Sequence, residues 1–338
     1  MSALGLRSID MKKYDVIALG ELLIDFTDSG ISAQGNTLFE ANPGGAPCNV
    51  LAMLNKLGHK TAFVGKVGTD IFGIHLKKML EEIHINTTSL RMDKDARTTL
   101  AFVQNDKTGE RNFSFYRNPG ADMMLHAEEV DEEMIKVSKM FHFGTLSMTH
   151  DTVREATKKA LNVAKANGLL ISFDPNLRES LWDTLENAKK QVEYGMNFCD
   201  VLKISDNELQ WFTGEEDYDK GIQKLKDEYN IPLILLSLGK GGSRAYYGDV
   251  CVEAPAFVRE DTVETTGAGD TFFGSCLHFV LEKGLDNLQE KDLKEMLIFA
   301  NAAASIITTR KGALMVMPSI EDIRNLKEEA KKHGYRNQ

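Results

Sequence analysis

The sequence predicts an α/β protein in which parallel strands are joined by crossover helices. Short apolar runs rich in β-forming residues alternate with segments of helical period, which is the pattern of that class. Four of the runs are apolar at nearly every position, as strands covered on both faces should be. We expect these four at the centre of the sheet: residues 16–19, 169–173, 201–204 and 233–236.

Amphipathic segments between the runs predict helices. Apolar residues recur at i, i+3, i+4 and i+7 in 50–57, where the pattern stops at Gly58, and again in 76–83. Residues 273–281 keep helical spacing until Gly284. Each of these segments is therefore expected to be a helix.

One region breaks the alternation of strands and helices. Residues 97–104 and 111–117 are two β-rich stretches separated by the turn-forming segment 105–110, which predicts a hairpin outside the main sheet. Together with the strand after Leu22, this hairpin would form a small β-sheet lid over a site. The lid strands are expected within about 22–40 and 97–118.

Length and composition favour a single domain. The chain has 338 residues, of which 42% are hydrophobic, enough for a sizeable core. It contains no internal repeat, low-complexity tract or Pro/Gly/Ser-rich linker. Residues 13–338 are expected to form one domain, with residues 1–12 as a flexible leader.

Charge and apolar patterning exclude several classes of function. A net charge of -10 without a Lys/Arg tract argues against a nucleic-acid partner. No uncharged apolar run approaches the roughly 18 residues of a membrane helix. The N-terminal segment lacks a secretory apolar core, so a cytoplasmic protein is predicted.

Cysteine and histidine residues give no sign of a disulfide or a metal motif. The cysteines lie far apart without a C-x-x-C pair, and all four are expected as buried thiols: Cys48, Cys199, Cys251 and Cys276. His142, inside an apolar run, is expected as a core histidine. Neither H-E-x-x-H nor the G-x-x-x-x-G-K-[ST] of P-loop enzymes occurs.

The segment 264–274 carries the strongest chemical signal. Gly267, Ala268 and Gly269 precede Asp270, where a helix is expected to open. A glycine turn at a helix N-terminus presents free backbone N–H groups, which with the helix dipole form an anion site suited to a phosphate. Asp270 could then take a proton from an attacking hydroxyl group. The alternative is a tight loop with Asp270 as a helix cap.

A second glycine pair lies near the N-terminus. Gly44 and Gly45 lead into a predicted helix and would let a polyhydroxylated ligand approach the backbone closely. The amide of Asn49 offers a donor and acceptors for sugar hydroxyls, and the carboxylate of Asp25 could accept two further hydrogen bonds. Taken alone, 42–49 is also an ordinary loop-to-helix junction, and a lone aspartate is more often a cap or a turn residue.

Together, G-G-A-P-C-N (44–49) and T-T-G-A-G-D-T-F (265–272) resemble the two signatures of the ribokinase-like sugar kinase family, in matching order and separation. The resemblance covers nearly the whole chain, from Gly20 to Ala313. It implies a doubly wound, mostly parallel sheet with helices on both faces and a small β-sheet lid. Within the family, 115–123 resembles a segment typical of fructokinases. Fructokinases usually have Ser at the position of Gly120.

The resemblance implies roles for individual residues. Asp270 matches the catalytic base of the family, and 267–269 matches its anion hole. Arg178 matches a position near the transferred phosphate, where its charge would offset developing negative charge; without the match it would be interpreted as a surface residue. The positions that match sugar-binding residues are Asp25, Gly44, Gly45 and Asn49.

The C-terminal half is expected to bind Mg·ATP. The segment 237–242 follows an apolar strand and resembles the nucleotide-binding strand end of the family, although it is not a full G-x-G-x-x-G fingerprint. By the same analogy, a helix with small residues at 302–304 packs beside the adenine. The predicted nucleotide-binding residues are Lys203, Ser237, Gly239, Gly242 and Asn301.

The predicted ion sites depart from the family pattern. The family commonly has N-x-x-E where this chain has Ser205 to Glu208; Glu208 is retained and is expected to help hold Mg²⁺ through water. Glu264 and Thr266 stand at a monovalent-cation site where the family usually has Asp in the first position. The longer side chain of Glu264 could displace the ion, so K⁺ is an open expectation.

The predicted function is ATP-dependent phosphorylation of a ketohexose, with D-fructose converted to fructose 6-phosphate. One alternative is a kinase of the same fold that acts on ribose, a nucleoside or a 2-keto-3-deoxy sugar acid. For a sugar acid, Arg97 or Arg117 of the hairpin could face the carboxylate of the substrate. Another is a catalytically silent sugar-binding regulator. Exposed edges of the lid also predict a homodimer.

Overall fold

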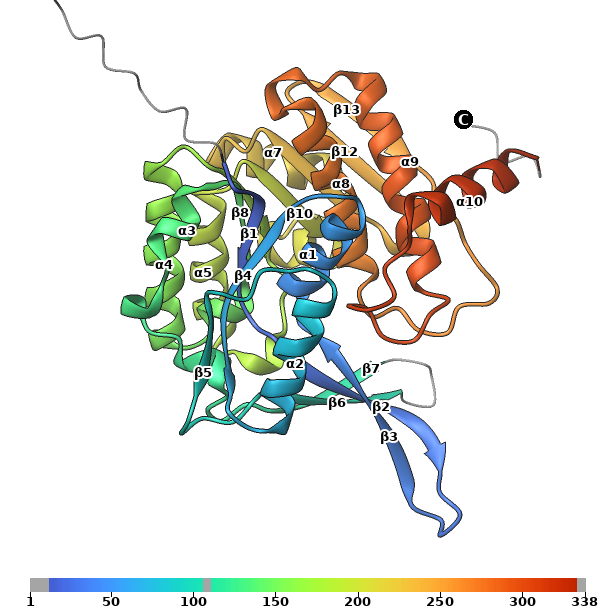
Figure 1. Cartoon of the computed structure of the whole chain (residues 1–338). Coiled ribbons are helices and arrows are strands. Elements are labelled where there is room, and N and C mark those ends of the chain that lie inside the picture. Colours follow the sequence, from blue (N-terminus) through green and yellow to red (C-terminus); the bar gives the residue numbers. More distant parts are fainter. Residues whose placement is uncertain (1–11, 106–110, 333–338) are drawn as a thin grey trace, which may run out of the picture.

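The structure is a computed structural model that describes residues 12–105 and 111–332. The strands of its main sheet are β1 (Tyr14–Leu19), β4 (Thr61–Gly68), β5 (Leu90–Asp93), β8 (Ser138–Gly144), β9 (Leu170–Asp174), β10 (Val201–Ser205), β11 (Leu233–Ser237), β12 (Ser243–Tyr247) and β13 (Val250–Ala254). They lie in the order β13-β12-β11-β10-β9-β8-β1-β4-β5 (Figure 1). The strands from β11 to β5 pair in parallel, whereas β12 and β13 are antiparallel.

The predicted α/β class and mostly parallel sheet are confirmed. The four apolar runs expected at the centre form β1, β9, β10 and β11. β8 lies between β1 and β9. Its residue His142 is buried, with Nδ1 3.1 Å from Oγ of Ser172, and burial lowers the pKa of His142 to about 3. His142 is thus the neutral core histidine that the sequence predicts.

Helices cover both faces of the sheet. They are α1 (Ala46–Lys56), α2 (Ile71–Glu82), α3 (Glu132–Lys136), α4 (Asp151–Ala166), α5 (Leu185–Met196), α6 (Asp206–Thr213), α7 (Tyr218–Tyr229), α8 (Ala268–Lys283), α9 (Glu290–Ile307) and α10 (Ile320–Lys332). Side chains of β1 alternate between two core clusters: Val16 and Ala18 pack with α1, α2, α8 and α9, whereas Ile17 and Leu19 pack with α4 to α7. The helices predicted from 50–57, 76–83 and 273–281 are confirmed as α1, α2 and α8.

A second, four-stranded sheet lies apart from the main one (Figure 1). Its strands are β2 (Leu23–Ile31), β3 (Thr37–Gly44), β6 (Leu100–Asn105) and β7 (Arg111–Tyr116), in the order β3-β2-β6-β7. The predicted hairpin is confirmed, because β6 and β7 pair antiparallel. Most of its predicted turn, residues 106–110, lies outside the described residues. We call this four-stranded unit the small sheet.

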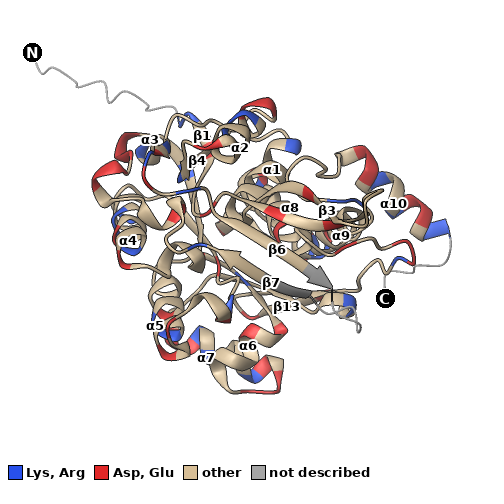
Figure 2. Ribbon diagram, turned by 90° about the horizontal axis from the view of Figure 1, so that it is seen from below, with Lys and Arg blue, Asp and Glu red and all other residues tan. Residues whose placement is uncertain are grey.

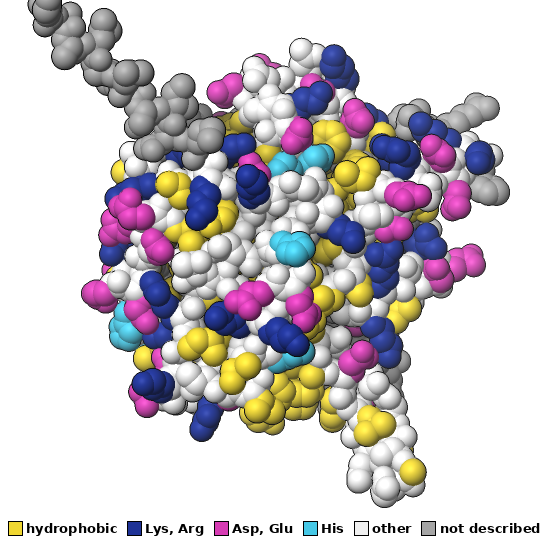
Figure 3. All heavy atoms as spheres, viewed as in Figure 1, with side chains coloured by type: hydrophobic (Ala, Val, Ile, Leu, Met, Phe, Trp, Pro, Cys, Tyr) yellow, Lys and Arg dark blue, Asp and Glu magenta, His cyan; other side chains and the backbone are white. Residues whose placement is uncertain are grey.

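The small sheet and the surface bear on two further expectations. The small sheet exposes the apolar side chains of Ile31, Leu38, Phe39 and Tyr116, and its projecting part shows hydrophobic atoms in Figure 3. The homodimer expected through these strands stays a prediction.

Acidic and basic residues are interspersed over the helices (Figure 2). Among the described residues we find no helix that is both long and apolar enough to span a bilayer.

One sequence expectation for the cysteines is wrong. Cys48, Cys199 and Cys276 are buried thiols as predicted, but Cys251 is exposed. Cys251 lies on β13, the outermost strand of the main sheet, where alternate side chains point away from the core. The leader expected over residues 1–12 falls outside the described residues, except for Lys12.

Helices α1 and α8 pack unusually close together, and Gly274 permits it. A Cβ atom added at Gly274 would lie 2.9 Å from Cβ of Met53 and 3.0 Å from the carbonyl oxygen of Val50. The backbones therefore approach in the middle of both helices. At their N-terminal ends, Asn49 of α1 donates a hydrogen bond of 2.8 Å to Asp270 of α8.

We expect Gly274→Ala to lower the free energy of unfolding. In a free helix this change would be favourable by about 0.5–1 kcal/mol, but overpacking against α1 costs about 1–3 kcal/mol. Urea unfolding measures the net effect. Gly221→Ala on α7 is the control, because the atoms nearest its new Cβ belong to the flexible side chain of Leu209. A Gly274→Ala protein more stable than wild type would contradict the packing argument.

Candidate active site

Two pockets meet at the N-terminus of α8. Their volumes are about 400 Å³ for the first pocket and about 300 Å³ for the second, and Thr265 and Gly269 line both. Of the residues predicted for the site, the first pocket is lined by Asp25, Gly45, Asn49, Arg178, Lys203, Thr266, Gly267, Gly269 and Asp270. The second is lined by Ser237, Gly239, Gly242, Ala268, Gly269 and Asn301.

The wall shared by the two pockets is the turn that opens α8. Gly267 is the N-cap residue and has a left-handed backbone with φ of 74°. A Cβ atom added at Gly267 would also lie only 2.5 Å from the Cβ atom of Ala313. No side chain caps the helix. The N–H of Ala268 donates to the carbonyl oxygen of Thr265 at 3.2 Å. The first N–H groups of a helix have no partner within it, so this turn presents the positive end of the helix dipole to both pockets.

Asp270 lies in the first turn of α8, where it is buried. Its Oδ2 accepts a hydrogen bond of 2.8 Å from Nδ2 of Asn49. Burial raises the pKa of Asp270, whereas the hydrogen bond from Asn49 and the charges of Lys203 and Arg178 counteract that rise. Because the cap is Gly267, the alternative interpretation of Asp270 as a simple helix cap is not supported.

A buried ion pair lies beneath the turn. Nζ of Lys203 is 3.0 Å from Oδ2 of Asp174, and both side chains are less than a tenth exposed. Burial raises the pKa of Asp174 to about 7. Burial acts to lower the pKa of Lys203, but the nearby carboxylates of Asp174, Glu208 and Asp270 outweigh it and raise that pKa. Lys203 therefore stays a cation. Its Nζ lies close to the turn, because a Cβ atom added at Gly269 would be only 3.3 Å from it.

Two glycines let the start of α1 approach β2 and the segment before it closely. A Cβ atom at Gly44 would overlap the carboxylate of Asp25, and one at Gly45, where φ is 127°, would overlap the carbonyl group of Glu21. The side chain of Glu21 accepts a hydrogen bond of 2.8 Å from the N–H of Ala46, the first residue of α1. Gly44 does not itself line the pocket, but it makes room for Asp25, which does.

The structure does not bring the two hairpin arginines to the site. The guanidinium of Arg117 is buried and donates to Oδ2 of Asp122, to Oγ1 of Thr149 and to the carbonyl oxygen of Leu146. Arg97 pairs through its backbone with the N–H of Ala121. Neither arginine lines a pocket. The expectation that Arg117 faces a substrate is corrected, because its donors are used to hold the protein together.

The second pocket contains all four nucleotide-site residues predicted from the strand end and from α9. Gly239 and Gly242 have φ of 53° and 96°, and a Cβ at Gly242 would overlap the carbonyl oxygen of Ala254. Asn301 uses its side chain internally: Oδ1 accepts from Ser243, and Nδ2 donates to the carbonyl groups of Ala254 and Pro255. Asn301 thus fixes the wall of the pocket as well as lining it.

The residues predicted for ions are engaged within the protein. Oε1 of Glu208 accepts from the N–H of Leu177, and Oε2 accepts from the N–H and the hydroxyl group of Ser205, which caps α6. Glu264 accepts a hydrogen bond of 2.6 Å from the N–H of Gly312. Thr266 lines the first pocket. The ion-binding roles of these residues stay predictions.

Sequence reasoning missed several pocket residues. In the first pocket these include Leu146 and Asn176, and in the second Phe257, Arg259 and Thr308. Asn176 has a positive φ of 42°, a conformation that asparagine tolerates better than most residues. The sequence D-P-N at 174–176 could have indicated this turn. Phe257 and Arg259, which follow β13, stand in no recognisable local pattern.

Comparison with known proteins establishes the class. Residues 9–320 match the model of the pfkB family carbohydrate kinases. The chain is 42% identical over 306 residues to a probable fructokinase-2 of Arabidopsis thaliana, covering 90% of this chain and 93% of that protein. It is 41% identical over 309 residues to fructokinase-2 of Solanum lycopersicum, covering 91% and 94%. The chain therefore belongs to the pfkB family of carbohydrate kinases.

Solved structures agree with that assignment. A fructokinase from Xylella fastidiosa with bound ATP aligns with a TM-score of 0.85 at 31% identity, covering 94% of this chain and 99% of that one. A double mutant of the fructokinase from Vibrio cholerae O395, in a form with fructose, ADP and potassium ion bound, aligns with a TM-score of 0.83 at 27% identity, covering 93% and 98%. The predicted ribokinase-like fold and carbohydrate kinase class are confirmed.

The bond between Asn49 and Asp270 predicts a change in pH dependence. In Asn49→Ala, Asp270 loses a donor that favours its ionised form, so its pKa rises further and protons inactivate it at a higher pH. The acidic limb of the pH profile of kcat/KM should therefore move to higher pH. Asn55→Ala, at the other end of α1, is the control. An acidic limb unchanged in Asn49→Ala would mean that Asp270 does not set it.

Proposed function

We propose that this carbohydrate kinase transfers the terminal phosphoryl group of ATP to D-fructose and forms fructose 6-phosphate. The observation that carries the proposal is the wall shared by the two pockets, because it offers a single point of transfer between two ligands. The first pocket would hold the sugar and the second the nucleotide. The relatives named fructokinase, at about 40% identity over most of the chain, support fructose as the acceptor.

The first pocket suits a polyhydroxylated ligand. It brings together the carboxylates of Asp25 and Asp270 and the amide of Asn49, so acceptors and a donor converge from the small sheet, α1 and α8. Within residues 12–105 and 111–332, Oδ1 of Asn49 has no hydrogen-bond partner. We propose that Asp25 and Asn49 hold sugar hydroxyls, with Gly44 and Gly45 providing the close approach.

The turn at α8 suits the phosphates of ATP. The first pocket is lined by the turn at Gly267 and Gly269 and by two cations, Lys203 and Arg178. The positive end of the helix dipole lies at the same place. ATP, when bound, supplies the phosphoryl group, and Mg²⁺ neutralises part of its charge. Because Oε1 of Glu208 accepts from the N–H of Leu177 and Oε2 takes part in capping α6, Glu208 would assist the ion through water.

The proposed chemistry is a direct transfer. Asp270 accepts the proton of the primary hydroxyl group that becomes phosphorylated, and Asn49 holds its carboxylate in place. The N–H groups of the turn from Gly267 to Gly269, together with Arg178, stabilise the charge on the transferred group. No covalent intermediate on the protein is needed.

Finer aspects of the function are also proposals. The fructokinase of Vibrio cholerae O395 is named with potassium ion bound, whereas here Glu264 already accepts a hydrogen bond from Gly312. We keep Glu264 and Thr266 as the K⁺ candidates. Exposed apolar residues of the small sheet, including Ile31 and Tyr116, support pairing of two copies there, and a cytoplasmic location fits a kinase that uses ATP.

A panel of acceptors tests the choice of sugar. ADP release should be fastest with D-fructose among fructose, ribose, a nucleoside and a 2-keto-3-deoxy sugar acid, and NMR of the product should show phosphate on carbon 6. The sugar acid is disfavoured because Arg117 is already paired with Asp122. Faster ADP release with any other acceptor would reassign the substrate, and fructose binding without ADP release would indicate a silent regulator.

Asp270→Ala should lower kcat by about 10²- to 10⁴-fold, because general-base catalysis contributes that much, while ATP affinity measured by calorimetry changes little. Asp292→Asn is the control. Asp292 is likewise a buried carboxylate in the first turn of a helix, α9, but it lines neither pocket. Turnover of Asp270→Ala within tenfold of wild type would remove Asp270 from the role of base.

A further inference from the structure

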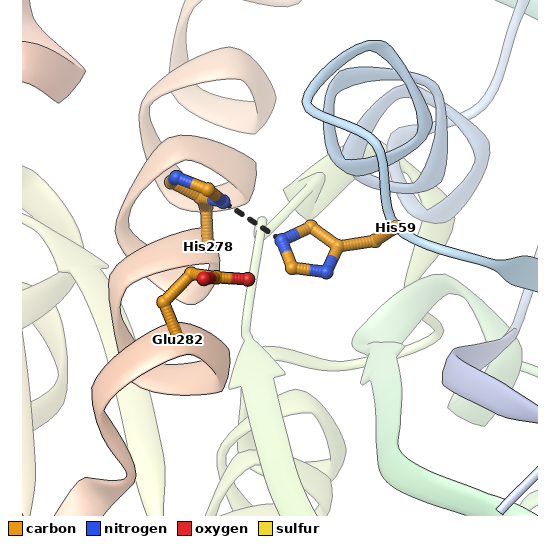
Figure 4. A group of neighbouring side chains, drawn as sticks. All are labelled: His59, His278 and Glu282. Carbon is orange, nitrogen blue, oxygen red and sulfur yellow. Dashed lines mark hydrogen bonds between the residues drawn. The ribbon is translucent and has the colours of Figure 1, made fainter.

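A cluster of three potential metal ligands lies away from both pockets. His59, His278 and Glu282 come together on the other side of the contact between α1 and α8 (Figure 4). None of them lines either pocket. His278 follows Asp270 by eight positions along α8, which corresponds to about 12 Å of helix. The cluster is therefore separate from the site that handles the sugar and ATP.

The backbone fixes all three side chains from two elements. His59 lies in the turn after α1, where its N–H donates to the carbonyl oxygen of Leu54 at 3.1 Å. His278 and Glu282 are four residues apart on α8, so their side chains share one face of the helix. Figure 4 shows the two imidazole rings and the carboxylate converging on one space.

The distances suit a shared ion. Nε2 of His59 and Nδ1 of His278 are 2.8 Å apart, and one ligand atom from each of the three residues lies within 4.8 Å of the others. Tetrahedral zinc with bonds of about 2.0–2.1 Å places its ligands about 3.3 Å apart. The two nitrogens would need to separate by only about 0.5 Å.

A neighbouring carboxylate sets the tautomer that a metal needs. Oδ2 of Asp15 is 3.8 Å from Nδ1 of His59, so it favours the proton on that nitrogen and leaves the lone pair of Nε2 facing His278. Nε2 of His59 then accepts the 2.8 Å hydrogen bond from Nδ1–H of His278. A bound ion would take the place of that proton, and His278 would carry its proton on Nε2 instead. Asp15 is itself held by the N–H of Lys60 and by the ammonium group of Lys139. A carboxylate behind a histidine ligand is the usual outer support of a zinc site.

The surroundings of both histidines lower their pKa values. Burial lowers the pKa of His59 and of His278, and although the charges of Asp15 and Glu282 oppose this, they do not reverse it. Lys139 adds to the lowering at His59.

We propose that His59, His278 and Glu282 form a Zn²⁺ site with a fourth position open to water. Two imidazoles and one carboxylate are ligands that suit zinc, whereas Mg²⁺ and K⁺ prefer sets of oxygen atoms. The bound ion would link the turn after α1 to α8 at the end opposite the pockets. The two histidines are 219 positions apart in the chain, which is why no local motif reveals the site.

Zinc binding to the full chain tests the proposal. After treatment with a chelator, the protein is titrated with ZnCl₂ by calorimetry in excess Mg²⁺, which occupies weak carboxylate sites. We expect one zinc per chain and a higher melting temperature with zinc. His278→Gln and Glu282→Gln should weaken binding at least about 100-fold and 10-fold respectively, and Asp15→Asn about 10- to 100-fold. Co²⁺ in place of zinc should give the visible absorption of a four-coordinate ion.

The control removes an unrelated imidazole. His75→Gln on α2 changes an exposed histidine outside the cluster and should leave zinc affinity unchanged. Glu282 is exposed, so Glu282→Gln should fold even if His278→Gln does not. Kinase activity with Mg·ATP should stay within about twofold of wild type in Glu282→Gln. An absence of zinc binding to the wild type, or equal zinc affinity in wild type and both cluster variants, would overturn the proposal.

Discussion

The packing of α1 against α8 is the constraint on which the rest of the site depends. The helices run side by side in the same direction, since Asn49 meets Asp270 at one end and His59 meets His278 at the other. Gly274 allows the close approach between them. Both helices therefore direct their N-termini, the positive ends of their dipoles, at the pockets. The helix dipoles alone therefore favour a ligand rich in oxygen atoms at this place.

Electrostatic balance around Asp270 follows from that arrangement. A buried carboxylate tends to hold its proton, which would remove a base, yet Asn49, Lys203 and Arg178 each favour the ionised form. The same cations face the position proposed for the transferred phosphate. In the proposed mechanism, one set of charges therefore serves both Asp270 as the base and the charge that develops during transfer. Asp174 keeps Lys203 charged and in place.

Local patterns were enough to predict the parts of the molecule that depend on neighbouring residues. Continuous apolar runs located β1, β9, β10 and β11, helical spacing located α8, and a glycine turn located the wall that the two pockets share. Contacts between distant segments could not be found in this way. The pairing of Arg117 with Asp122 and the exposure of Cys251 depend on which way each side chain faces, and the meeting of His59 with His278 depends on the packing of two helices.

The division between the two sheets has a consequence for how such enzymes diversify. Asp25 belongs to β2 of the small sheet, whereas Asn49 and Asp270 belong to helices of the core. On the roles proposed above, mutations that reshape the small sheet alter which acceptor fits and leave the residues of α8 in place. Selection can then act on sugar preference and on phosphoryl transfer as largely independent traits.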